Sequence, residues 1–111
     1  MIHLIEQHRP ELISLCQRYR VRQLDLFGSA AKGTFQPTKS DLDFVVQFDA
    51  PGEPGYASRY YDFATSLEKL FQRPVDLLTE RMIRNVYFRE EVDQTRQNIW
   101  VDVETRRGAS L

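Results

Sequence analysis

The chain has 111 residues, of which 41% are hydrophobic and 28% charged, and its formal net charge is −1. This length predicts a single domain over residues 1–111, and the near-neutral charge does not indicate direct nucleic-acid binding. No signal peptide and no apolar run of about 18 residues or more is present, so the sequence predicts no membrane segment. The single cysteine, Cys16, cannot form an internal disulfide. We therefore expect a cytoplasmic protein in which Cys16 is a small buried apolar residue.

The first predicted elements alternate between helix and strand. Apolar residues recur at helical spacing through residues 2–19, where Pro10 is expected to open the main helix at its first turn. Alternating apolar residues predict a strand over residues 21–27. The small residues 29–32 are compatible with a short helix, and residues 34–40, which include a proline, predict a loop.

A second strand, a long helix and a third strand are predicted in the middle of the chain. Residues 41–48 form the strand pattern, and the proline- and glycine-rich residues 49–55 predict a loop. Apolar residues spaced as on one helical face then predict an amphipathic helix over about residues 57–72. The sequence "VDLLT" at residues 75–79 predicts a short strand.

The last part of the chain predicts helix followed by a final strand. Residues 80–97 read as helical with a break near Asn85, and Thr79 is the expected N-cap. Residues 99–103, "IWVDV", predict a last short strand, and the polar residues 104–111 predict a flexible tail.

Three aspartates are expected to share one face of the sheet. In the strand at residues 41–48, Asp41 and Asp43 alternate with apolar residues on the opposite face: Leu42, Phe44, Val46 and Phe48. Asp76 lies on the polar face of the strand at residues 75–79. If these two strands pair with their polar faces aligned, the three carboxylates lie together.

Carboxylates that lie close together repel one another and are costly to bury, so they are typical of sites that bind a hard cation. Mg²⁺ prefers carboxylate and phosphate oxygens. The Cα atoms of Asp41 and Asp43 are expected about 6.5–7 Å apart on a strand. This spacing suits two metal ions roughly 3.5–4 Å apart, as in phosphoryl-transfer sites, and Asp76 would complete the ligands of one ion. The alternative is a strand-capping pair or an exposed strand face.

The turn Gly28-Ser29 is a candidate phosphate site. Glycine lets the backbone approach a ligand closely, and Ser29 offers a hydroxyl together with backbone N–H groups at a possible helix start. The alternative is an ordinary strand-to-helix turn. Lys32 and Lys39 are either phosphate-steering residues or solvated surface lysines.

Taken together, these motifs resemble the minimal nucleotidyltransferases of the DNA polymerase β-like superfamily. The resemblance consists of "LFGS", then "SDLDFVV" after eleven intervening residues, and then the late "VDLL". It covers about residues 10–100. Small members often carry arginine at the position of Lys32. The resemblance implies an α+β fold in which a small mixed β-sheet is backed by helices.

The resemblance also implies an activity and a partner. Asp41, Asp43 and Asp76 would be catalytic and hold Mg²⁺, as two ions, with ATP as donor. The nucleotide would contact the Gly28-Ser29 turn together with Lys32 and Ser40. Free-standing chains of this size resemble the antitoxins of HEPN-domain RNase toxins, which transfer AMP to a toxin tyrosine and thereby neutralise it. The alternative is an antitoxin that only binds and masks its toxin.

Two other enzyme classes fit the sequence less well. The stretch "DLDFV" matches a haloacid-dehalogenase pattern, but in that fold an apolar strand precedes the first aspartate, whereas here "QPTKS" precedes it. A Walker-type nucleotide-binding loop requires G-x-x-x-x-G-K-[ST], and the glycine spacing in "GSAAKGTF" is different.

Overall fold

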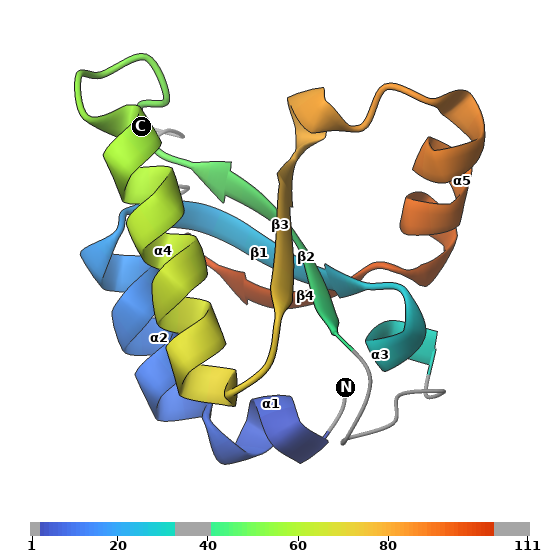
Figure 1. Cartoon of the computed structure of the whole chain (residues 1–111), viewed down its shortest axis with the longest axis horizontal. Coiled ribbons are helices and arrows are strands. Elements are labelled where there is room, and N and C mark those ends of the chain that lie inside the picture. Colours follow the sequence, from blue (N-terminus) through green and yellow to red (C-terminus); the bar gives the residue numbers. More distant parts are fainter. Residues whose placement is uncertain (1–2, 33–40, 104–111) are drawn as a thin grey trace.

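The computed structural model describes residues 3–32 and 41–103 and is shown in Figure 1. Its elements follow the predicted order. In chain order they are α1 (His3–Gln7), α2 (Arg9–Arg18), β1 (Val21–Phe27), α3 (Ser29–Lys32), β2 (Leu42–Phe48), α4 (Tyr56–Phe71), β3 (Val75–Thr79), the 3-10 helix η1 (Glu80–Met82), α5 (Val86–Thr95) and β4 (Gln97–Val101).

The strands form one four-stranded mixed sheet in the order β3-β2-β1-β4. β1 pairs antiparallel with both β2 and β4, whereas β2 and β3 are parallel. A parallel pair needs a long crossover connection, and α4 provides it. The sheet and its helices confirm the predicted α+β class.

Each face of the sheet packs against different helices, because side chains alternate along each strand. Figure 1 shows α2 and α4 together on one side of the sheet and α5 on the other. The larger core cluster lies under α2 and α4 and includes Leu12, Cys16, Leu24, Leu26, Phe44, Val46, Phe63 and Leu67. The smaller cluster lies under α5 and contains Phe27, Val45, Ile83 and Val92, with Leu78 packed against it.

Two boundaries near the end of the chain differ from the sequence prediction. Thr79 makes no side-chain capping bond, and the Asn85 side chain instead accepts hydrogen bonds from the N–H groups of Tyr87 and Phe88 at the start of α5. The break predicted near Asn85 is present and separates η1 from α5, but the capping residue is Asn85. The last strand begins at Gln97, two residues earlier than predicted, because Gln97 pairs with Leu26 of β1.

The structure buries Cys16 completely, as predicted, and burial raises the pKa of its thiol to about 12. None of the helices within residues 3–32 and 41–103 has the length and apolarity needed to cross a bilayer. The predicted loop at 34–40 and the tail at 104–111 lie outside the described residues.

Candidate active site

Two of the predicted aspartates meet on neighbouring strands. Asp43 is the second residue of β2 and Asp76 the second residue of β3, and the parallel register pairs them directly. Their side chains therefore point to the same face of the sheet, and Asp76 is close enough to raise the pKa of the Asp43 carboxyl.

The surroundings of Asp43 favour its protonated form. The pKa of Asp43 is raised to about 7, chiefly by burial and further by the neighbouring carboxyl groups of Asp76, Asp41 and Glu91. All of these effects disfavour the negative charge of Asp43. A proton or a cation placed at this carboxyl therefore relieves both desolvation and repulsion.

The structure places Asp41 differently from Asp43 and Asp76. Asp41 is exposed and lies just before the first residue of β2, where its charge acts on Asp43. Within the part of the chain that the structure describes, no three carboxylate, imidazole or thiol side chains are arranged to hold one ion together. The close arrangement is thus the Asp43–Asp76 pair, and a ligand role for Asp41 remains a prediction.

The Gly28-Ser29 turn lies directly beside this pair. Phe27, the residue before Gly28, is the register partner of Asp43. Gly28 has a φ of +73°, and a Cβ added to it would be 2.6 Å from Asp43 Oδ2. Ser29 then begins α3. The close approach explains why glycine is needed at this position.

We expect the substitution Gly28→Ala to lower the free energy of unfolding by about 1–3 kcal/mol, because it adds both backbone strain and a clash with Asp43. Urea unfolding monitored by circular dichroism measures this change. Gly52→Ala is the matched control, since a Cβ at Gly52 meets no atom within 4 Å. Equal stability of the two variants would contradict the explanation.

The other groups predicted to contact the nucleotide are the Lys32 side chain, the Gly28 N–H and Ser40. Lys32 Nζ is 3.8 Å from Glu91 Oε1, and both side chains are largely exposed, so this ion pair is weak. The N–H of Gly28 already donates to Thr95 Oγ1 at 3.1 Å, so it is engaged within the protein. Ser40 lies outside the described residues.

The aspartate pair opens into a cleft of ≈ 550 Å³. Its lining residues are Phe27, Gly28, Ser29, Asp43, Asp76, Leu78, Phe88 and Glu91. A second depression of ≈ 340 Å³ lies along α4 and β3, and it includes Tyr60, Tyr61 and Asp76. Asp76, on the edge strand, therefore lines both hollows.

The comparison with protein families agrees with this geometry. The family model described as the nucleotidyltransferase domain matches residues 11–101, which include both strands of the aspartate pair and the Gly28-Ser29 turn. The chain belongs to the nucleotidyltransferase domain family. This confirms the resemblance given above and makes the protein a nucleotidyltransferase enzyme.

Individual relatives of this nucleotidyltransferase point the same way. It is 36% identical over 80 residues to MJ1379, a proposed protein adenylyltransferase of Methanocaldococcus jannaschii. The matched region covers 72% of this chain and 78% of that protein. A solved structure of a proposed minimal nucleotidyltransferase has a TM-score of 0.69 at 28% identity, covering 88% of this chain and 97% of that one.

A third similarity concerns the fold alone. A chain in the complex of a tri-AMPylated Shewanella oneidensis HEPN toxin with an MNT antitoxin has a TM-score of 0.59 at 16% identity. The alignment covers 92% of this nucleotidyltransferase and 76% of that chain.

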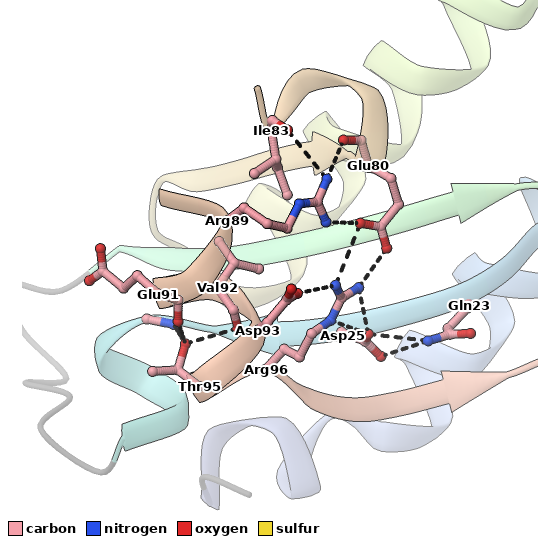
Figure 2. Close-up of polar contacts among 11 residues, drawn as sticks. Gln23, Asp25, Glu80, Ile83, Arg89, Glu91, Val92, Asp93, Thr95 and Arg96 are labelled. Carbon is pink, nitrogen blue, oxygen red and sulfur yellow. Dashed lines mark hydrogen bonds and ion pairs between the residues drawn. The ribbon is translucent and has the colours of Figure 1, made fainter. Parts of the chain in front are cut away.

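The sequence analysis missed a charged network that fixes the α5 wall of the cleft (Figure 2). Arg96, directly after α5, lies 2.9 Å from Asp25 of β1 and 2.7 Å from Glu80 of η1. Arg89 of α5 contacts Glu80 at 2.6 Å. Thr95 completes the link to the site, since its hydroxyl accepts from Gly28. A sequence signal existed, because Asp25 lies in an apolar strand and a buried carboxylate needs a partner.

The residues present fit a hard divalent cation. Asp43 and Asp76 offer adjacent carboxylate oxygens, and both Asp41 and Glu91 add negative charge around Asp43. Oxygen donors of this kind are those that Mg²⁺ prefers. Beside them, the Gly28-Ser29 turn leaves no room for a Cβ, so the backbone there lies close to the carboxylates.

Proposed function

We propose that this nucleotidyltransferase transfers AMP from ATP to a tyrosine of a HEPN-domain RNase toxin and thereby neutralises it. The observation that carries the proposal is the Asp43–Asp76 carboxyl pair, side by side in the parallel register of β2 and β3 and next to the Gly28-Ser29 turn. The relative named as a protein adenylyltransferase supports a protein acceptor. The fold shared with a chain of an AMPylated toxin complex supports a HEPN-domain partner.

In this proposal Asp43 and Asp76, together with Asp41, would hold Mg²⁺, as two ions. When bound, Mg²⁺ supplies neutralisation of the negative charge that develops on the transferring and leaving phosphates. Gly28 and Ser29 would contact the triphosphate, and Lys32 and Ser40 are further candidate contacts. The cleft supports these assignments, because the Gly28-Ser29 turn lines it together with Asp43 and Asp76.

The chain's own residues then position and deprotonate the acceptor. The tyrosine oxygen forms a bond to the α-phosphorus of ATP, the bond from that phosphorus to the pyrophosphate oxygen breaks, and the phenolic proton passes to the Asp76 carboxylate. Asp76 lines the nucleotide cleft and, with Tyr60 and Tyr61, the second depression, so its carboxylate can be approached from either hollow. The products are an AMP-tyrosine phosphodiester and pyrophosphate.

The experiment is incubation of the purified protein with α-labelled ATP, Mg²⁺ and a HEPN-domain RNase toxin, the proposed partner. We expect label on a tyrosine of the partner, located by mass spectrometry, and its loss in Asp41→Ala and Asp76→Ala variants. A partner that stays unlabelled would contradict the proposal. If these variants suppress the toxin's RNase activity as well as the wild type does, binding and masking explain neutralisation instead.

A further inference from the structure

An exposed apolar segment lies at the entrance of the cleft. Among the residues that the structure describes, six large hydrophobic side chains are exposed, and four of them fall in residues 81–88. These four are Met82, Val86, Tyr87 and Phe88, with exposed fractions of 48%, 66%, 78% and 36%. Large exposed apolar side chains that gather in one segment indicate an interaction surface.

The backbone of this segment is held in place although its side chains are exposed. Ile83 is buried in the smaller core cluster. Arg89 donates to the backbone oxygens of Glu80 and Ile83 at 2.8 and 3.3 Å, as Figure 2 shows. Asn85 caps the start of α5. A surface fixed in advance loses little conformational entropy on binding, which favours association.

Two arginines give the same segment a positive charge. Arg81 and Arg84 are exposed, and neither forms a hydrogen bond or ion pair with any residue within 3–32 and 41–103. By contrast, Arg89 and Arg96 are neutralised by carboxylates. The chain as a whole has a net charge of −1, so this basic and apolar segment differs from the average surface.

The segment is continuous with the cleft. Phe88 lines the same hollow as Asp43 and Asp76, and its ring meets that of Phe27 at 6.0 Å. A molecule bound across Met82, Val86 and Tyr87 therefore ends beside the aspartate pair. This is the position that a hydroxyl acceptor must occupy.

We propose that residues 81–88 are the docking surface for the protein acceptor, and that the acceptor presents an acidic surface with apolar side chains next to its target hydroxyl. This inference rests on the proposed function for the identity of the partner. The arginines attract the acidic partner and set its orientation. The apolar side chains supply the buried contact at the centre of the interface.

Other occupants fit the surface less well. A nucleic acid requires several cationic contacts to phosphates, and the segment offers two free arginines followed by the exposed Glu90 and Glu91. In a symmetric pair of copies in which the segment faces itself, Arg81 and Arg84 would meet like charges.

The experiment measures binding of the proposed HEPN-domain partner by titration calorimetry at two salt concentrations. We expect the double substitution Arg81→Glu/Arg84→Glu to raise Kd by about tenfold or more at low salt, and Tyr87→Ser to raise it by about tenfold. The controls are Arg18→Glu/Lys69→Glu and Val103→Ser, which change exposed side chains elsewhere. ATP binding is expected to be unchanged in all four variants.

The outcomes separate this inference from the proposed function. If the partner binds through Arg81 and Arg84 but receives no AMP, the docking surface stands and AMP transfer fails. If transfer and binding are both unaffected by Arg81→Glu/Arg84→Glu, the docking surface is wrong and the function stands. Absence of partner binding by the wild type, or binding of a single-stranded RNA that depends on these arginines, would also overturn the docking surface.

Discussion

Replacing Asp43 by asparagine is expected to lower the rate of AMP transfer on the order of 10³-fold and at the same time to make the protein harder to unfold. The loss of activity follows because an amide is a poor ligand for a divalent cation and carries no charge to balance it. The gain in stability follows because the asparagine amide can donate a hydrogen bond to Asp76 without placing a charge at the half-buried position 43.

The stability gain depends on pH in a defined direction. The pKa of Asp43 is raised from 3.8 to about 7 in the folded protein, so the folded state binds this proton more tightly than the unfolded state does. The stabilisation from protonated Asp43 is complete below about pH 4 and is lost as pH rises through about 7. The free energy of unfolding of Asp43→Asn is therefore expected to be about 1–2 kcal/mol higher than that of the wild type at pH 8 and nearly equal to it at pH 4. The value at pH 8 is reduced because Asp43 is partly exposed to solvent.

Urea unfolding at pH 4 and pH 8, with and without Mg²⁺, measures these differences. Asp62→Asn is the control, because Asp62 is an exposed carboxylate on α4 away from the cleft, and we expect it to behave as the wild type at both pH values. Added Mg²⁺ is expected to stabilise the wild type and Asp62→Asn but not Asp43→Asn. A variant that is less stable than the wild type at pH 8 would contradict the electrostatic account.

The substitution Arg96→Met is expected to lower the free energy of unfolding by about 2–4 kcal/mol, because it leaves the buried Asp25 carboxylate without a cation. The Arg96 guanidinium contacts Asp25, Glu80 and Asp93 at 2.9, 2.7 and 3.0 Å, and the Asp25 side chain is 5% exposed. Thermal unfolding and hydrogen exchange of the α5 amides measure the loss. Faster exchange is expected in α5, which Arg96 joins to β1 and η1.

A double-mutant cycle separates the ion pair from simple loss of packing. Adding Asp25→Asn to Arg96→Met removes the unpaired charge, so we expect the double variant to be more stable than Arg96→Met alone. Lys32→Met is the comparison for a lysine whose ion pair is exposed, and its effect is expected to stay within about 0.5 kcal/mol. Additive effects of the two buried substitutions would argue against a direct Asp25–Arg96 interaction.

The sequence predicts the strands and the polar faces of Asp43 and Asp76, because both depend on local pattern. Alternation of apolar and polar residues marks β1, β2 and β3, whereas the pairing of β2 with β3 entered the prediction as a condition and the predicted trio with Asp41 is a close pair in the structure. The short helix after Gly28 begins and ends as predicted, since a strand that stops at glycine is a strong local signal. These features need no knowledge of distant contacts.

Features that depend on distant contacts were not predicted. The network around Arg96 joins residues 71 positions apart, from Asp25 to Arg96, and no periodicity records such a pairing. The N-cap was assigned to Thr79 because threonine is a good capping residue, but the chain makes a 3-10 turn there and the helix starts after Asn85. The depression that gives Asp76 a second exposed side arises from the packing of α4 against the edge strand.

The burial of Cys16 has a practical consequence for following this protein in solution. Its thiol has no exposed surface and its pKa is raised to about 12, so it does not react with maleimide dyes while the fold is intact. A cysteine introduced at Gly52, where a side chain meets no neighbour, therefore becomes the one reactive position for a fluorophore. Figure 1 shows that the turn before α4 lies at the opposite end of the sheet from α3, so the dye reports partner association without entering the cleft.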